Sequence, residues 1–497
     1  MKKYILVIDE GTTGTRALIF NKKFEIVAKK YSEFTQFTPS EDRVEHDAME
    51  IYNKCIEVCR EAIRLAKISP EEIDSIGITN QRATCLVWDK TTGKPLYNAI
   101  VWQDNRTSDL AKKINDSKWG EKARKATGWT VAPVYSSLML NWYINNVPAI
   151  KEKIDSGEAL FGTIDTWLIW KLTNGKVHAT SYSNASVMGS LDLKTGKWFT
   201  EFLDYLGIPE SIYPDVREDS SNFGSTDPEI FGVAIPITGV IADQHAALFA
   251  QGCVEPGMGK CTNGTGTFID VNIGNNCVVS DKGLNTVIAW KLNGQTTYAV
   301  EGYSAVTGSA IQWLRDGLGI IKSAEETEKI SISVEDSNGV YFVPALAGLS
   351  APYWDSFARG MIIGITRGTT SAHIVRATLE AIAFLCRDIF KSISSDANVK
   401  MKSINIDGGA SANNFLAQFT SDMIGATVFR PLSLEATSLG AAQMAGLSTG
   451  FWKMVDFKDI VEIERTFTPG ISEEKAEALS KNWQEAVKRC SGWIKSN

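Results

Sequence analysis

A polar turn rich in glycine and threonine stands between two apolar runs, and this pattern occurs twice in the chain. The first copy, IDEGTTGTRA at residues 8–17, follows the apolar run YILVI and leads into ALIF. The second, NGTGTF at residues 263–268, leads into a further apolar run about half a chain length later. Repetition of a strand–turn–strand pattern at this distance predicts two halves of related architecture.

The length of the chain agrees with two halves. A chain of 497 residues is too long for one hydrophobic core, so two large domains are expected. Glycine and proline cluster at residues 252–259, which places the boundary there. The sequence therefore predicts an N-terminal lobe over 1–250 and a C-terminal lobe over 251–497.

Strand and helix signals alternate along the chain, and this alternation predicts an α/β fold. Strands are expected at 73–79, 84–88 and 236–241, a helix at 244–250, and a strand, glycine turn and helix from residue 404. A further helix starts after His46-Asp47, which can cap it. Its buried face is predicted to hold Ile51, Cys55, Val58, Cys59, Ala62 and Leu65.

Composition excludes several functional classes. The net charge of −7 and the scattered basic residues argue against nucleic-acid binding. The first apolar run ends at Asp9 and Glu10, too early for a signal peptide, and no stretch approaches the length of a membrane span. Eight cysteines without a CxxC pair indicate a reduced, cytoplasmic protein, and the four histidines show no metal-ligand spacing.

The Gly/Thr turns have the chemistry of a phosphate site, although an ordinary hairpin turn has the same residue types. Glycine lets the backbone N–H groups approach an anion, and Arg16 adds a charged donor. Asp9 offers the carboxylate oxygen that Mg²⁺ prefers. Gly252–Met258 has P-loop glycine spacing but lacks the lysine, and no GxGxxG follows the first strand. Two turns and the late Gly408-Gly409 pair together predict ATP in a cleft.

The sequence resembles the FGGY family of carbohydrate kinases, and within it the glycerol kinases, over nearly its whole length. The stretches that carry this resemblance are IDEGTTGTRA (8–17), ITNQR (78–82), NAIVWQ (98–103), LFGTIDTWLIWKLT (160–173), DQHAALF (243–249), NGTGTF (263–268), SAIQWLRD (309–316), GLSAPYWDSFARG (348–360), RATLEAIAF (376–384) and IDGGASANNFLAQF (406–419). The resemblance implies two ribonuclease-H-like lobes of the actin and hexokinase type with a central cleft. It also implies ATP and Mg²⁺ as cofactors and a homodimer or homotetramer.

The resemblance assigns roles to individual residues. It implies Asp243 as the catalytic base, although an aspartate at that place is also a common helix N-cap. Asp9 would be the metal carboxylate. The implied nucleotide contacts are Thr12, Thr13 and Arg16 in the first half and Thr265, Gly308, Gln312, Gly409 and Asn413 in the second. The implied acceptor contacts are Arg82, Trp102, Asp243, Gln244 and Phe268.

Two departures from the family pattern fall on the acceptor wall. Ala83 stands where the family has a glutamate, so a hydrogen-bond acceptor for a polyol hydroxyl is lost. Val134 stands at a substrate-contacting tyrosine position, and Tyr135 would replace it only if the backbone shifts by one residue. Residues 226–236 do not resemble the loop that binds fructose 1,6-bisphosphate in some relatives, so no such regulation is expected.

These departures leave the acceptor open. Transfer to glycerol, giving sn-glycerol 3-phosphate, is favoured. A longer polyol or ketose, such as erythritol, threitol, a pentitol or a ketopentose, would fill the space left by Ala83. A non-catalytic ATP-binding switch is a third reading, against which Arg82, Asp243 and Gln244 argue.

Overall fold

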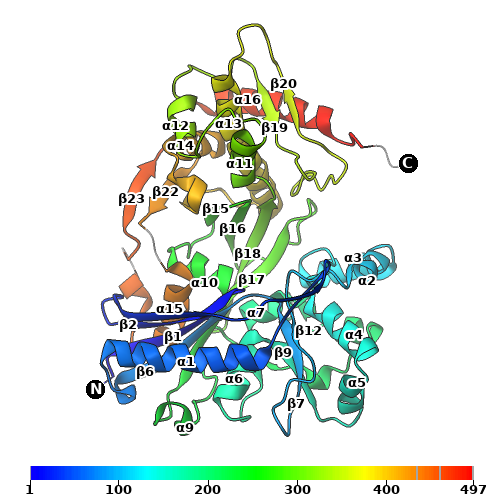
Figure 1. Cartoon of the computed structure of the whole chain (residues 1–497), viewed down its shortest axis with the longest axis vertical. Helices are drawn as coiled ribbons and strands as arrows, with labels where there is room; N and C mark the ends of the chain where they lie inside the picture. Colours follow the sequence, from blue (N-terminus) through cyan, green and yellow to red (C-terminus); the bar gives the residue numbers. More distant parts are fainter. Residues whose placement is uncertain (1, 433–434, 458–459, 495–497) are drawn as a thin grey trace. The chain divides into compact units, whose positions relative to one another are not determined.

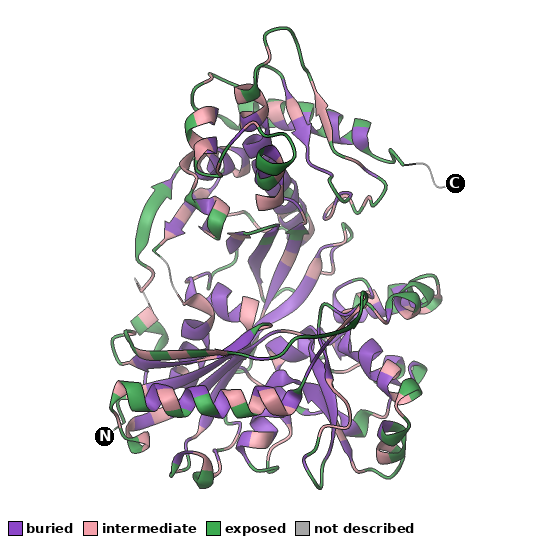
Figure 2. Cartoon of the chain, in the orientation of Figure 1, coloured by how far each residue is buried: buried purple, intermediate pink, exposed green. Residues whose placement is uncertain are grey.

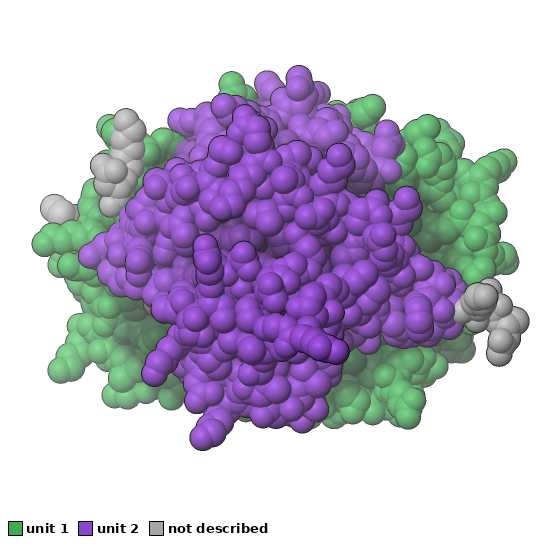
Figure 3. Space-filling model, turned by 90° about the horizontal axis from the view of Figure 1, so that it is seen from above, with its two compact units in different colours: residues 1–252, 286–298, 435–460 green, residues 253–285, 299–434, 461–497 purple. Residues whose placement is uncertain are grey.

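The computed structural model describes residues 2–432, 435–457 and 460–494, which form two compact units (Figures 1 and 3). Unit 1 comprises residues 1–252, 286–298 and 435–460, and unit 2 comprises residues 253–285, 299–434 and 461–497. The first change of unit, after Gly252, lies close to the expected boundary. The segments 286–298 and 435–460, which the sequence placed in the second lobe, belong to unit 1.

Unit 1 is built on a five-stranded sheet in the order β14-β6-β1-β2-β3. Its strands are β1 (Tyr4–Glu10), β2 (Gly14–Asn21), β3 (Ile26–Glu33), β6 (Ile73–Asn80) and β14 (Ile237–Ala242). The first Gly/Thr turn joins β1 to β2 as an antiparallel pair, while β6 runs parallel to both β1 and β14. The strands expected at 73–79 and 236–241 are therefore confirmed, and both end at the same edge of the sheet.

The remaining elements of unit 1 are a second sheet, short strands and helices. A second five-stranded sheet has the order β4-β5-β8-β7-β9, and β7 confirms the strand expected at 84–88. These strands are β4 (Phe37–Ser40), β5 (Arg43–His46), β7 (Cys85–Asp89), β8 (Ala99–Ile100) and β9 (Ala159–Thr163). The short strands and helices are β10 (Ala179–Ser181), β11 (Leu191–Asp192), β12 (Lys197–Trp198), β13 (Asp215–Arg217), α2 (Ser108–Asn115), α3 (Lys118–Thr127), α4 (Ser136–Asn146), α5 (Pro148–Asp155), α6 (Ile164–Leu172), α7 (Tyr182–Ser186), α8 (Thr200–Tyr205) and α9 (Pro228–Phe231).

Helix α1 (Ala48–Ala66) covers one face of the first sheet. Asp47 caps it, because its side chain accepts hydrogen bonds from the Met49 and Glu50 amides. The predicted apolar stripe packs into one core with residues of β1, β2 and β6, which Figure 2 shows as a buried layer. Leu65 is the exception, with 44% of its surface exposed, because it lies in the last turn before the left-handed cap residue Lys67.

Helices α10 (Asp243–Ala250) and α15 (Ala436–Thr449) are positioned by small residues. A Cβ added at Gly77 of β6 or Gly239 of β14 would collide with the backbone of α15. A Cβ at Gly440 of α15 would collide with the carbonyl group of Ala246 in α10. These glycines allow α15 to lie directly against the sheet and against the helix that begins at Asp243.

Gly440→Ala is therefore expected to destabilise unit 1, although alanine favours a helix. The added methyl group meets backbone atoms, which cannot move aside as a flexible side chain would, and overpacking of this kind costs about 1–3 kcal/mol. Urea unfolding would measure the change. Gly470→Ala is the control, since its Cβ would meet only side-chain atoms at 3.5 Å or more. Equal stability of both variants would contradict the packing argument.

Unit 2 contains the second Gly/Thr turn, which belongs to a seven-stranded sheet in the order β17-β18-β16-β15-β21-β22-β23; residues 286–298 of β17 and β18 are the segment assigned to unit 1. Its strands are β15 (Met258–Asn263), β16 (Thr267–Gly274), β17 (Asn285–Leu292), β18 (Gln295–Ser304), β21 (Ser403–Asp407), β22 (Thr427–Pro431) and β23 (Ile463–Phe467). As in unit 1, the turn joins an antiparallel pair, β15 and β16, and the first strand of that pair is parallel to a later one, β21. The predicted internal repeat thus appears as one topology used twice.

Helices of unit 2 pack around a core of their own. They are α11 (Gly308–Asp316), α12 (Glu326–Ser331), α13 (Ser371–Ala397), α14 (Asn414–Ile424) and α16 (Glu473–Cys490), with a small sheet of β19 (Tyr341–Val343) and β20 (Met361–Ile363). The glycine turn after β21 continues into the 3-10 helix η3 (Gly409–Ala412) and then α14, as predicted. Within the described residues, every helix is too short or too polar to cross a membrane.

Candidate active site

The turn between β1 and β2 is held rigid by contacts within unit 1. The Gly11 amide donates to the carbonyl group of Gly14 at 3.0 Å, which closes the turn over two threonines. Arg16 bridges two carboxylates: Nη2 lies 2.9 Å from Asp9 Oδ2, and Nη1 lies 2.8 Å from Glu435 Oε2. The guanidinium group therefore stands beside the turn with its position fixed from both sides.

Asp9 is buried at the end of β1, with 3% of its surface exposed. Burial raises the pKa of its carboxyl group, while Arg16 and a hydrogen bond from the Ser438 hydroxyl group act in the opposite direction. The contacts from Arg16 and Ser438 both reach Oδ2. Sequence reasoning missed Ser438 and Glu435, because it assigned the whole of 251–497 to the second lobe.

Arg82 and Asp243 meet at the edge of the sheet where β6 and β14 end. The Arg82 Nε atom lies 3.4 Å from Asp243 Oδ1. The two strands are parallel neighbours, with Asn80 opposite Ala242, so the residues that follow them lie together. Asp243 is the first residue of α10, and its carboxylate accepts a hydrogen bond from the adjacent Gln244 amide at 2.6 Å. The N-cap position belongs to Ala242, so the alternative reading of Asp243 as an N-cap is wrong.

Trp102 connects this edge to the Gly/Thr turn. Its indole Nε1 donates to Thr12 Oγ1 at 3.0 Å, and 41% of its surface is exposed. Unit 1 therefore brings together Asp9, Thr12, Arg16, Arg82, Trp102, Asp243 and Gln244 around the carboxyl ends of three neighbouring strands.

Tyr135 is not placed with these residues. It is fully buried in a core of unit 1, and its hydroxyl group donates to the Trp129 carbonyl group at 2.7 Å. Its ring also packs at a tilt of 50° against the ring of Trp129, with centroids 4.4 Å apart. A side chain satisfied in this way does not face a substrate, so the geometry argues against the one-residue shift that would have made Tyr135 an acceptor contact.

Unit 2 carries a cavity of about 330 Å³ at the second Gly/Thr turn. Four of the predicted nucleotide residues line it: Thr265, Gly308, Gln312 and Gly409. Close approach of the backbone shapes the wall, because a Cβ at Gly308 would lie 2.7 Å from the Gly264 carbonyl oxygen. A Cβ at Gly409 would meet no atom within 4 Å.

The other two predicted residues of unit 2 lie outside the lining of this cavity. Asn413 caps α14 by accepting a hydrogen bond from the Leu416 amide, and its Nδ2 donates to Thr327 Oγ1 at 3.0 Å. Phe268 of β16 is 46% exposed and packs against the ring of Tyr303, with centroids 4.6 Å apart.

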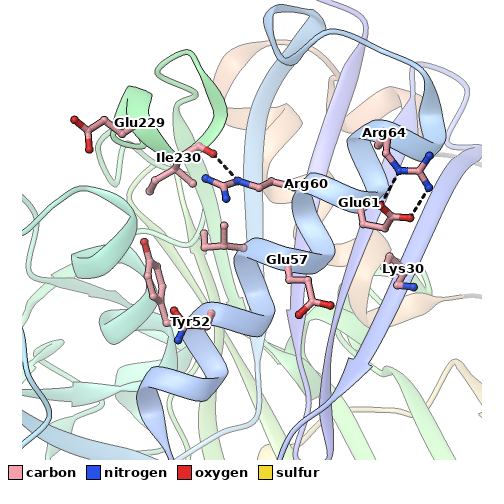
Figure 4. A pocket seen from close by; sticks show the side chains of 10 residues that line it. Lys30, Tyr52, Glu57, Arg60, Glu61, Arg64, Glu229 and Ile230 are labelled. Atoms are coloured by element: carbon pink, nitrogen blue, oxygen red, sulfur yellow. Dashed lines mark hydrogen bonds and ion pairs between the residues drawn. The ribbon is translucent and has the colours of Figure 1, made fainter.

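A larger hollow on unit 1, of about 680 Å³, contains none of the predicted residues (Figure 4). It lies between β3, α1 and α9, and its charged side chains contact neighbouring groups. Arg60 donates to the Ile230 carbonyl group at 3.0 Å, and Arg64 pairs with Glu61 at 2.7 Å. Volume alone therefore does not identify the active site.

Asp219 supports the start of α10 from within the protein. Its carboxylate accepts hydrogen bonds from the Ser183 amide at 3.2 Å and the Lys291 amide at 2.8 Å. The Ser183 hydroxyl group in turn accepts from the amide of Ala242, the residue before Asp243. Burial raises the pKa of Asp219 to about 7, above its ordinary value of 3.8.

This raised pKa predicts that Asp219 makes a contribution to the free energy of unfolding that is lost as the pH rises. Between pH 3.8 and about 7 the folded chain keeps a proton on Asp219 that the unfolded chain has lost. The contribution is fully present below the unfolded pKa and is lost by about pH 7, with a slope of up to about 1.4 kcal/mol per pH unit. Asp219→Asn removes it, so a plot of unfolding free energy against pH should fall less steeply for the variant. Parallel plots would refute this.

Comparison with known proteins matches most of the chain to one family. The N-terminal domain of the FGGY family of carbohydrate kinases matches residues 4–250, and its C-terminal domain matches residues 259–449. Glycerol kinase 2 of Thermotoga maritima is 48% identical over 494 residues, covering 99% of this chain and all of that protein. A glycerol kinase of Caldanaerobacter subterraneus subsp. tengcongensis is 49% identical and covers 99% of both.

Solved structures show the same similarity. The crystal structure of Plasmodium falciparum glycerol kinase with ADP matches with a TM-score of 0.94 and 36% identity, over 99% of each chain. Gluconate kinase from Lactobacillus acidophilus shares the fold, with a TM-score of 0.87 at 20% identity over 98% of each chain. The expected two-domain α/β fold is confirmed, and the chain belongs to the FGGY family of carbohydrate kinases.

Proposed function

We propose that this kinase transfers the γ-phosphate of ATP to a terminal hydroxyl group of glycerol, giving sn-glycerol 3-phosphate. The observation that carries the proposal is the Arg82–Asp243 pair, with a 3.4 Å separation, at the end of two parallel strands. It supplies a carboxylate to accept a proton and a guanidinium group to orient a hydroxyl. The identity of about 48% to glycerol kinases over the full length supports glycerol as the acceptor.

The acceptor contacts come from side chains of complementary chemistry. Arg82, Asp243 and Gln244 offer donors and acceptors for adjacent hydroxyl groups. Trp102 offers a partly exposed aromatic surface for the carbon atoms. Tyr135 is omitted, because its hydroxyl group is bonded inside the core.

Asp243 acts as the base in the transfer. The acceptor hydroxyl group loses its proton to the Asp243 carboxylate as its oxygen bonds to the γ-phosphorus. The bond between that phosphorus and the β,γ-bridging oxygen breaks, and ADP leaves with the electron pair. Arg82 keeps the base oriented through the contact between Nε and Oδ1.

The nucleotide is held by groups in each unit. The cavity of unit 2 takes the adenosine part against Thr265, Gly308, Gln312 and Gly409. Asn413 supports this wall by capping α14. In unit 1, Thr12 and Thr13 offer hydroxyl and amide donors to phosphate oxygens, and Arg16 adds a charged donor.

Asp9 fits a role beside Mg²⁺. The described residues contain no cluster of three or more His, Cys, Asp or Glu side chains that would cage a metal. A single carboxylate is sufficient for Mg²⁺, which is usually held by one or two carboxylates, water and substrate phosphates. When bound, the ion would neutralise charge on the transferring phosphate.

The chemistry is tested by measuring ADP release from ATP and Mg²⁺ with glycerol, erythritol, threitol, xylitol, xylulose and ribulose. Glycerol is expected to give the highest kcat/KM. Ala83 is only 2% exposed, so this position offers little open space for a longer acceptor. A longer acceptor that wins by more than about tenfold, or about 1.4 kcal/mol, would overturn glycerol as the substrate. Slow hydrolysis that no acceptor stimulates would overturn the kinase itself.

Two further properties complete the proposal. We infer a cytoplasmic location, since none of the eight cysteines forms a disulfide in the described part of the chain. We also infer a homodimer or homotetramer, as the family resemblance implies. Light scattering coupled to gel filtration measures the mass directly, and a monomer at working concentration would contradict the assembly.

A further inference from the structure

We propose that Gln81 and Thr84 are positioning residues that hold Trp102 and Arg82 in fixed register with the Gly11–Thr12 turn. Four hydrogen bonds make a closed ring. Gln81 Nε2 donates to the Gly11 carbonyl group at 3.0 Å, and Thr84 Oγ1 donates to Gln81 Oε1 at 2.8 Å. The Trp102 amide donates to Thr84 Oγ1 at 3.2 Å, and the Trp102 indole donates to Thr12 Oγ1 at 3.0 Å.

Each bond in this ring fixes the direction of the next. The Gly11 carbonyl group only accepts, so it must face the Gln81 amide nitrogen. The Gln81 oxygen then faces Thr84. The Thr84 hydroxyl group donates its single proton to this oxygen and accepts a hydrogen bond from the Trp102 amide. Gln81 is 1% exposed and Thr84 is fully buried, so water does not compete for the bond between their side chains.

The ring also secures an unusual backbone turn that carries Arg82. Ala83 has a φ of 63°, and the Thr84 amide donates to the Arg82 carbonyl group at 2.8 Å, which together define a γ-turn. Such a conformation is strained for a residue other than glycine and persists only where its surroundings hold it. Gln81 and Thr84 flank the turn, and Ser136 Oγ donates to the Ala83 carbonyl group at 2.8 Å.

This arrangement gives the ring a role in transfer, which rests on the proposed function. Trp102 and Arg82 are acceptor contacts, and Thr12 is a phosphate contact. The ring joins them through the buried side chains of Gln81 and Thr84, so a loosened ring would let the acceptor hydroxyl group move out of the line of attack. Displacements of about 1 Å can lower rates about a hundredfold.

Thr84→Val tests the proposal, because valine keeps the shape and removes the hydroxyl group. The value of kcat/KM for glycerol is expected to fall by about tenfold or more, while KM for ATP changes by less than about twofold. Thr84→Ser restores the hydroxyl group and should recover most of the loss. Thr166→Val is the matched control: Thr166 is fully buried in α6, and its hydroxyl group has no hydrogen-bond partner among the described residues.

A double-mutant cycle tests whether the ring acts as a unit. Gln81→Met breaks the same ring at another bond, so the double variant should be about as active as the worse single variant. Losses that multiply would refute the ring. A wild-type value of kcat/KM in Thr84→Val would also refute the ring. So would a fall in kcat/KM no larger than that of Thr166→Val, or one that Thr84→Ser shows as well. Wild-type enzyme without glycerol-dependent ADP release would instead refute the proposed function, and that assay comes first.

Discussion

Asp243→Asn is expected to lower kcat for phosphate transfer by about 10²–10⁴-fold while leaving the affinity for ADP nearly unchanged. Asparagine keeps the shape and the position at the start of α10, but its amide cannot accept the acceptor proton. It also removes the charge that pairs with Arg82 Nε. The nucleotide cavity lies in unit 2, so the substitution should not change its wall. ADP release at saturating glycerol measures kcat, and calorimetry measures ADP binding.

Asp227→Asn is the matched control in the same unit. Asp227 caps α9 by accepting a hydrogen bond from the Glu229 amide, and asparagine caps helices about as well. Its kcat should equal that of the wild type. If Asp243→Asn keeps full turnover, Asp243 is not the base. A parallel loss of ADP affinity would show that the substitution disturbs more than proton transfer.

The helices, strands and turns that carry the site were predicted from the sequence, because each of them depends mainly on residues that are neighbours in the chain. The Gly/Thr turns stand between apolar runs with strand composition, and both join antiparallel pairs in the structure. Asp47 and the apolar stripe after it define α1 for the same reason. Leu65 was misplaced, since periodicity gives the direction of a face but not the point at which the covered surface ends.

Contacts between segments that are far apart in the chain could not be predicted from such local patterns. Ser438 and Glu435 reach Asp9 and Arg16 over more than 400 residues of chain. The small residues of α15 indicate close packing, but they fit any closely packed partner and do not specify the sheet of unit 1. A division of the chain at one point does not describe such contacts, since residues 286–298 and 435–460 belong to the first unit.

Tyr135 and Ala83 show a different limit of prediction from the sequence. The family pattern placed Tyr135 against the substrate only if the backbone shifted by one residue. A tyrosine is equally well accommodated in a core when a backbone acceptor such as the Trp129 carbonyl group is within reach of its hydroxyl group. The γ-turn at Ala83 has no composition signal, because alanine is a poor residue for positive φ. Only the surrounding hydrogen bonds explain why the chain adopts it.

Gly409→Leu is expected to raise KM for ATP by about ten- to a hundredfold, which corresponds to about 1.4–2.8 kcal/mol. Gly409 lines the cavity of unit 2, and a Cβ at this position would meet no atom within 4 Å. A leucine side chain would therefore occupy space that the nucleotide needs. The proposed glycerol contacts Arg82, Asp243 and Gln244 lie in unit 1, so the KM for glycerol should change by less than about twofold. Initial rates over a range of ATP and glycerol concentrations measure both constants.

The neighbouring glycine separates occlusion from damage to the fold. Gly408 has a φ of 86°, and its Cβ would lie 2.5 Å from the Asn263 carbonyl oxygen. Gly408→Ala should therefore lower the unfolding free energy by about 1–3 kcal/mol from backbone strain alone. Gly409→Leu should leave thermal stability close to that of the wild type while ATP binding weakens. If both variants lost stability equally, the effect of Gly409→Leu on ATP would come from a disturbed turn and not from a filled cavity.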